Sequence, residues 1–135
     1  MLRLRQVEAS AWSILAICDE RGACQVQEFM HRLETDSPGD FDQITAQLRR
    51  TAVSGPPQND RKSRPLADKL FEFKTRRGIR IPYFYDEGRV IICTEAMRKP
   101  KKAELRAVIK RAQAQRTRYF EAKRSQAVVI IQEDA

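Results

Sequence analysis

The sequence is poor in the residues on which metal sites and disulfide frameworks depend. It contains one histidine, His31, and three cysteines, Cys18, Cys24 and Cys93, with no CxxC pair among them. A structural zinc site needs about four such ligands at close spacing, so we expect no metal and no cofactor. The odd number and wide spacing of the cysteines also argue against a disulfide framework, and they favour a reducing, cytoplasmic location.

Long hydrophobic runs are missing as well. No stretch approaches the roughly 20 apolar residues that are needed to cross a bilayer. Near the N-terminus, Arg3 and Arg5 precede the apolar stretch 11–18 in the manner of an export signal. That stretch is short and has Glu8 close to it, so we interpret it as a buried strand and expect no membrane partner.

Charge, in contrast, is abundant and unevenly distributed. The net charge is +8, and residues 1–60 hold 6 Lys or Arg against 9 Asp or Glu, whereas residues 61–135 hold 20 against 9. Such a density of cations in one half of a chain is typical of proteins that bind a polyanion. A solvated basic face that only keeps the protein soluble accounts for the composition equally well, so charge alone does not decide.

The first half of the chain predicts one strand followed by a helix. Residues 12–18 are apolar at successive positions, as in a strand that is covered by helices on one side. After Gly22 the apolar residues recur at helical spacing, and His31 falls off this stripe, so we expect it on the surface. The stripe consists of Val26, Phe29, Met30 and Leu33.

A second helix is expected between Ser37 and Ser54. Ser37 is placed as its N-cap, Pro38 as its first residue, and Asp40 as the partner of Ser37 in a capping box. Gly55 and the prolines after it end the helix. We expect residues 56–66 to form a polar connection.

From Lys69 the apolar period changes to two, which predicts three consecutive antiparallel strands. The first contains Phe71 and Phe73, the second spans 79–85, and the third spans 89–94. Arg77-Gly78 and residues 86–88 supply the two turns. Pro82 cannot donate to a ladder, so we expect a bulge or an unpaired edge position there.

The last long element is a helix that begins after Pro100 and continues to about Lys123. Its apolar stripe, from Leu105 to Phe120, should dock on the sheet, and its other faces carry cations along more than about 30 Å, at ~1.5 Å per residue. Residues 127–131 either pair with an edge strand, such as residues 2–6, or are disordered.

These elements predict one α+β domain over residues 1–135, with a core at about 12–124 and a tail at 125–135. The order strand, helix, helix, three-strand antiparallel meander, helix resembles the RelE/ParE/HigB superfamily of toxins from bacterial and phage toxin–antitoxin pairs. Residues 70–74 and 78–86 resemble the "LWELR...GIRVLYFYD" segment of its phage-derived HigB-like branch. Residues 98–105 resemble the lysine-rich run of that branch and the start of its final helix.

The resemblance implies a small RelE-like fold and a function as a toxin. Such a toxin is an endoribonuclease, a hydrolase that cleaves mRNA through the 2′-hydroxyl, usually on the ribosome and without a metal. The implied partners are mRNA, the ribosome and a cognate antitoxin, often a helix-turn-helix protein.

Cleavage by this route needs cations fixed where charge develops on the phosphate. We expect this role for three residues, with Arg80 as the phosphate clamp because it matches the arginine of the family's "YR" motif. Lys74 replaces the arginine of "ELR" and keeps the charge without the bidentate fork. The predicted catalytic residues are Lys74, Arg80 and Arg98. The predicted RNA-binding residues are Arg76, Arg77, Lys99, Lys101, Lys102 and Arg106.

The segment 94–100 departs from the family. Its members often show "HGF.KKT.KTP" here, whereas this chain has no His, Gly or Phe in the segment and no obvious general acid. We expect Tyr83, Tyr85 and Tyr119 in the core, and Glu95 is either a base or a solvated carboxylate. The alternative function is therefore a non-catalytic module that binds RNA, or gyrase as relatives of the ParE branch do.

Overall fold

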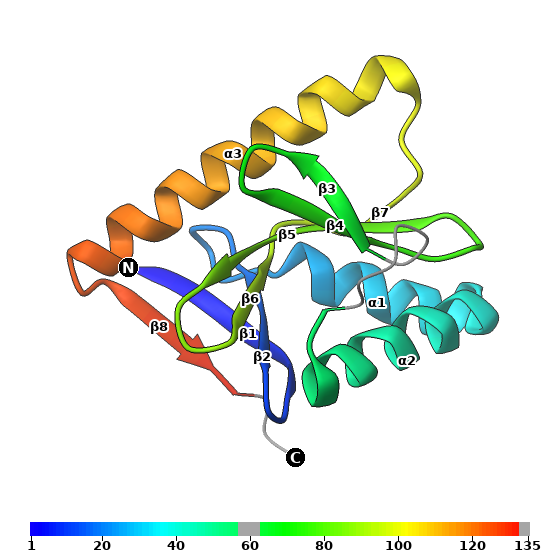
Figure 1. Cartoon of the computed structure of the whole chain (residues 1–135), viewed down its shortest axis with the longest axis horizontal. Coiled ribbons are helices and arrows are strands. Elements are labelled where there is room, and N and C mark those ends of the chain that lie inside the picture. The colour runs from blue at the N-terminus through cyan, green and yellow to red at the C-terminus, as the bar shows by residue number, and fades with distance from the viewer. Residues whose placement is uncertain (57–62, 133–135) are drawn as a thin grey trace.

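The computed structural model describes residues 1–56 and 63–132 of the chain. A mixed sheet forms its centre, with α1 and α2 on one side and α3 on the other (Figure 1). The helices span Gln25–Asp36 (α1), Pro38–Ser54 (α2) and Lys102–Arg124 (α3). The strands span Leu2–Ala9 (β1), Ser13–Ile17 (β2), Ser63–Ala67 (β3), Leu70–Lys74 (β4), Ile79–Asp86 (β5), Val90–Cys93 (β6), Met97–Arg98 (β7) and Val128–Ile131 (β8).

The strands of the described sheet follow the order β3-β4-β5-β6-β2-β1-β8, and β7 pairs with β5. The meander β4–β5–β6 is antiparallel, as expected, whereas β2 pairs with β6 and β1 with β8 in parallel. The mixed α+β class is thus confirmed.

Alternation along the strands divides the core into two layers. Phe73, Ile81 and Tyr83 are buried against α1 and α2, while Leu70 and Phe84 are buried against α3. In β2 the same alternation sends successive residues to both layers, which explains its unbroken apolar run. The prediction of helices on one side of this strand was therefore incomplete, because α3 covers its other face.

The helices begin and end close to the predicted positions. Gly55 follows α2 with φ of 87°, a left-handed conformation that glycine adopts without strain. The predicted capping box is only half right. The hydroxyl of Ser37 does not cap a backbone N–H and instead donates a 2.6 Å hydrogen bond to the carboxylate of Asp40.

Pro82 lies inside the sheet and not at its edge. It pairs with Glu72 in the regular ladder of β4 and β5, and its carbonyl accepts a hydrogen bond of 3.0 Å from the backbone N–H of Thr94. The missing N–H points to the same side as that carbonyl, where the partner of β5 changes from β7 to β6. The expected interruption of the ladder therefore lies not in β5 but in the segment that pairs with it, between β6 and β7.

The pattern of apolar residues did not predict β3. It also placed the start of the core at about residue 12, which left out β1. Residues 63–66 of the expected polar connection belong to β3, which pairs with β4, while residues 57–62 lie outside the described residues. Of the two expectations for the tail, strand pairing is confirmed, since β8 pairs with Leu2–Arg5 of β1. Leu2 and Leu4 are buried, so the core includes β1.

Within residues 1–56 and 63–132, no helix has both the length and the apolar character that would let it cross a membrane.

Candidate functional site

Two of the predicted catalytic cations lie side by side. Lys74 of β4 is directly opposite Arg80 of β5 in the antiparallel ladder, so their side chains project from the same side of the sheet. Because Phe73 and Ile79 point to α1 and α2, Lys74 and Arg80 point to the side of α3. The Arg80 side chain is mostly buried and Lys74 is partly exposed, and no carboxylate within the described residues forms an ion pair with Lys74.

A buried carboxylate, Glu72, lies two residues before Lys74 on the same side of β4. Its Oε1 atom is 2.8 Å from Nε of Arg64 and 3.5 Å from Nε of Arg80, and its side chain is only 3% exposed. Arg64 is 42% exposed and stands opposite Glu72 in the ladder of β3 and β4. Arg64 is not among the predicted site residues, because residues 56–66 were expected to form a polar connection with no part in a site. We name Arg64, Glu72, Lys74 and Arg80 the cation cluster.

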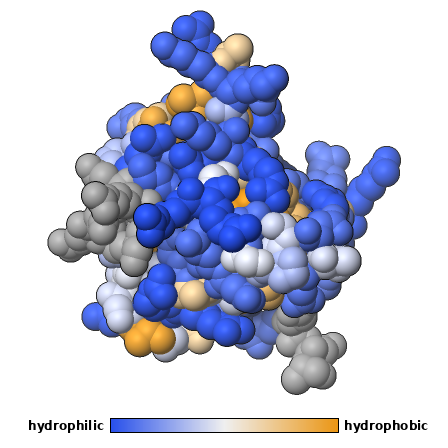
Figure 2. All heavy atoms as spheres, turned by 90° about the vertical axis from the view of Figure 1, so that its right-hand side faces the viewer, coloured by the Kyte–Doolittle hydropathy of each residue, from blue (hydrophilic) through white to orange (hydrophobic). Residues whose placement is uncertain are grey.

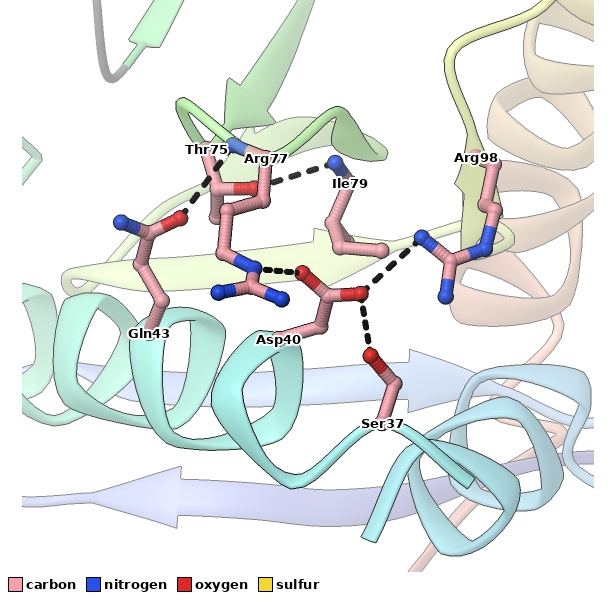
Figure 3. Close-up of polar contacts among 7 residues, drawn as sticks. All are labelled: Ser37, Asp40, Gln43, Thr75, Arg77, Ile79 and Arg98. Carbon is pink, nitrogen blue, oxygen red and sulfur yellow. Dashed lines mark hydrogen bonds and ion pairs between the residues drawn. The ribbon is translucent and has the colours of Figure 1, made fainter.

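Arg98 does not join the cation cluster. It stands opposite Ile79 in the pairing of β5 with β7, so its side chain projects toward α1 and α2. There its Nη1 atom is 3.0 Å from Oδ2 of Asp40, at the start of α2 (Figure 3). The sheet thus separates Arg98 from Lys74 and Arg80, although the three are close in the strand register.

Asp40 forms a second cluster with Arg98 and Arg77. Nε of Arg77 donates to Oδ1 of Asp40 at 2.5 Å, and the Ser37 hydroxyl donates to Oδ2 (Figure 3). The hydrogen bond from Ser37, followed by those from Arg77 and Arg98, holds the pKa of Asp40 below its ordinary value despite burial. Asp40 is 5% exposed in its side chain, whereas both arginines are more than half exposed.

This second cluster joins three elements. Arg77 lies in the β4–β5 turn, Arg98 in β7 and Asp40 in the first turn of α2, where a carboxylate is also favoured by the helix dipole. The backbone N–H of Arg77 donates to the side chain of Gln43 as well, at 3.4 Å. We name Asp40, Arg77 and Arg98 the helix-start cluster, because its contacts attach the start of α2 to the sheet.

The predicted RNA-binding cations are exposed and lie at one end of the molecule. They occur in the β4–β5 turn, after β7, and at the start of α3. Figure 2 views this end and shows a surface that is mostly hydrophilic, with a few scattered apolar patches. The residues concerned are Arg76, Arg77, Lys99, Lys101, Lys102 and Arg106.

The three tyrosines lie away from the cation cluster, two on the other side of the sheet and one at the far end of β5. Tyr83 and Tyr85 lie on the side of α1 and α2, with their hydroxyl groups 3.2 Å apart. Tyr119 donates a 2.5 Å hydrogen bond to Asp86 at the far end of β5. Burial and the neighbouring Asp86 raise the pKa of Tyr119, which makes it a poor proton donor as well as a distant one.

Glu95 lies in the break between β6 and β7, on the α3 side. It forms two hydrogen bonds with Arg111 of α3, Nε to Oε1 at 3.0 Å and Nη2 to Oε2 at 3.3 Å. Its side chain is 21% exposed. Met97, opposite Arg80, is two residues further along, so Glu95 is about 7 Å along the chain from that position.

The cysteines are buried, and burial raises the pKa of the Cys18 thiol to about 11. The described part of the chain contains no group of His, Cys, Asp and Glu side chains that could hold a metal ion.

The family model for the Gp49-like phage-derived proteins matches residues 29–130, which is more than half of the chain. The matched range includes both clusters. The match agrees with the resemblance of residues 70–105 to phage-derived proteins, whereas membership of the RelE/ParE/HigB superfamily stays a prediction. No curated protein matches the chain.

Proposed function

Since the chain belongs to the Gp49-like family of phage-derived proteins, we propose that it is the toxin of a type II toxin–antitoxin pair and that it cleaves mRNA. The observation that supports this proposal most directly is the pair of adjacent cations, Lys74 and Arg80, on one side of the sheet. Lys74 has no ion-pair partner among the described residues, so its charge is available to a phosphate.

The chemistry is attack of a 2′-hydroxyl on the adjacent phosphorus atom. The 2′-oxygen loses its proton and bonds to phosphorus, and the 5′-oxygen leaves and takes up a proton. The products carry a 2′,3′-cyclic phosphate and a 5′-hydroxyl. The pentavalent species between them carries two negative charges, so cations that are already in position lower its energy.

In this proposal Arg80 and Lys74 contact the oxygens of the reacting phosphate. The exposed cations at the start of α3, such as Lys102 and Arg106, contact phosphates of the flanking nucleotides. Glu95 is our candidate for the base, because it is a partly exposed carboxylate on this side of the sheet.

The partners that fit this function are mRNA on the ribosome and a cognate antitoxin in the cytoplasm. An antitoxin with acidic and apolar side chains would cover the exposed cations and neutralise the toxin by occupying the RNA site.

A non-catalytic binding module is the second candidate, and one observation favours it. The tyrosines that could protonate the leaving oxygen are engaged elsewhere, and the single histidine lies on the surface of α1. A module of this kind would bind RNA or gyrase and release no cleaved product.

The test is expression of the wild-type protein and of Arg80→Ala in growing cells, with mapping of RNA 5′ ends. We expect wild type to stop growth and to create new 5′ ends, and Arg80→Ala to do neither. Arg49→Ala is the matched control, since it removes an exposed arginine from α2 and should behave as wild type. Growth arrest without new 5′ ends would favour the binding module. Equal harmlessness of wild type and Arg80→Ala would rule the toxin out.

A further inference from the structure

Arg64 and Arg80 approach one carboxylate oxygen from opposite sides. Arg64 is on β3, Glu72 on β4 and Arg80 on β5, and all three side chains project toward α3. Both arginines use Nε to contact Oε1 of Glu72, at 2.8 Å and 3.5 Å. Each guanidinium group therefore still has its two terminal nitrogen atoms for another acceptor.

We propose that Arg64 is a catalytic residue that binds the reacting phosphodiester together with Arg80 and Lys74, and that Glu72 is the positioning residue that orients both arginines. This inference rests on the proposed function and deepens it. It assigns a phosphate contact to β3, a strand that the sequence pattern did not predict.

The charge of the cation cluster fits the reaction. Arg64, Lys74 and Arg80 contribute three positive charges and Glu72 one negative charge, which leaves a net charge of +2. A phosphodiester in RNA carries one negative charge, while the pentavalent species carries two. The cluster therefore matches the charge of the pentavalent species better than that of the bound substrate, which is the difference that accelerates a reaction.

The geometry explains why a carboxylate belongs among these cations. Neighbouring strands are about 4.8 Å apart, so β3 and β5 are separated by about 10 Å and their arginines must lean toward β4 to meet. Glu72 draws both Nε atoms to one point and offsets the repulsion between the two guanidinium groups. Arg80 is only 12% exposed, so without Glu72 its charge would be buried without a counterion.

The first experiment compares RNA cleavage by purified wild type, Arg64→Lys and Arg64→Gln. We expect Arg64→Gln to lower kcat on the order of 100-fold, the loss typical of one missing contact to a developing charge. Arg64→Lys should recover part of that loss, since it restores the charge without the fork. Arg49→Gln, which also removes an exposed arginine from an ion pair with a glutamate, is the matched control and should retain full activity. A kcat for Arg64→Gln within about threefold of wild type would overturn the proposal.

The second experiment tests the positioning role of Glu72. Glu72→Gln should lower kcat by a similar factor, while its affinity for RNA with a 2′-deoxy nucleotide at the cleavage position should stay the same or increase, because one negative charge is removed. The double variant Glu72→Gln/Arg64→Gln should lose little more activity than either single variant. Losses of kcat that multiply in the double variant would show that Glu72 does not act through Arg64. Thermal unfolding of each variant identifies any general loss of fold.

A failure of the proposed function is distinguishable from a failure of this inference. If wild type binds RNA but releases no cleaved product, the proposed cleavage is wrong and the phosphate contact is tested by binding alone. Arg64→Gln should then weaken binding at low salt, and the slope of log K against log salt should fall by about one unit. An unchanged slope would refute the contact.

Discussion

The cation cluster and the helix-start cluster each place two arginines on one buried carboxylate, but they connect different kinds of elements. Asp40 lies on a helix and holds arginines from the β4–β5 turn and from β7. Glu72 lies in the sheet and holds arginines from the strands on either side of it. The two clusters face opposite sides of the same sheet.

The difference separates a contribution to stability from a contribution to side-chain orientation. The sheet ladder does not hold the start of α2, so the ion pairs of Asp40 attach it. The ladder already fixes β3, β4 and β5, so the ion pairs of Glu72 mainly orient side chains. We therefore expect substitutions in the helix-start cluster to lower the free energy of unfolding, and substitutions in the cation cluster to lower the rate of RNA cleavage.

The largest effect on stability should come from Asp40→Ala. It removes a buried carboxylate with two ion pairs and a hydrogen bond from Ser37, so we expect the free energy of unfolding to fall by about 3 kcal/mol. Urea unfolding measures this change. Asp42→Ala, which alters an exposed residue of the same helix, should change it by less than about 0.5 kcal/mol. Equal losses in the two variants would contradict an attaching role for Asp40.

Arg80 and Arg98, the two arginines that the sequence predicts as catalytic, should differ in how much their substitution slows cleavage. Arg80→Gln should lower kcat by about 100-fold, which corresponds to a barrier about 2.7 kcal/mol higher, whereas Arg98→Gln should keep kcat within about threefold of wild type. The reason is that Arg98 faces Asp40 across the sheet from Lys74. Cleavage assays with both purified variants measure the contrast. A loss as large for Arg98→Gln would show that RNA contacts both sides of the β4–β5 hairpin.

Acid should weaken the helix-start cluster. The folded pKa of Asp40 is below its ordinary value of 3.8, so the unfolded chain takes up the proton first as pH falls. The contribution of Asp40 to the free energy of unfolding is complete above about pH 3.8 and is lost as the pH falls through the folded pKa. Burial alone would raise the pKa of Asp86, but the hydrogen bonds from Lys123, Tyr119 and the backbone of Glu87 together outweigh it and lower that pKa, so the same direction applies there.

Unfolding measured between pH 7 and about pH 2 tests this dependence. Asp40→Asn should be less stable than wild type at neutral pH and should lose less stability on acidification, while Asp86 preserves part of the slope. Parallel curves for wild type and Asp40→Asn would mean that Asp40 titrates alike in both states.

The smallest effect concerns Gly39, at the start of α2. A Cβ atom there would lie 3.0 Å from Nη1 and 3.2 Å from Cζ of Arg77, so that side chain must move. In wild type this strain should offset the helix propensity of alanine, and Gly39→Ala should change stability by less than about 0.5 kcal/mol. In an Arg77→Ala background the same change should stabilise by about 0.5–1 kcal/mol. A double-mutant cycle by urea unfolding measures the difference, and strict additivity would argue against the contact.

Local signals in the sequence were sufficient for the three helices and the meander. The stripe from Val26 to Leu33, Pro38 with Gly55 around α2, and the alternation from Phe71 to Tyr85 each act over a few residues, and each is reproduced in the structure. The adjacency of Lys74 and Arg80 is also local in origin, because a hairpin with a short turn sets the register of its two strands.

The side of the sheet to which Arg98 points, and the meeting of Arg64 with Glu72, were decided by tertiary structure. A shift of one residue in strand register moves a side chain to the opposite face, and nothing near Arg98 in the sequence specifies its register with β5. The register of Arg64 with Glu72 depends on an irregularity between Pro65 and Ala67 in the β3–β4 hairpin, which the alternation of apolar residues does not indicate. The pairing of β8 with β1 likewise joins the two ends of the chain. The sequence by itself determined which elements form and that their cations are concentrated late in the chain. Strand pairing and its register decided which of those cations share a face, and thereby which of them the proposed function assigns to one phosphate.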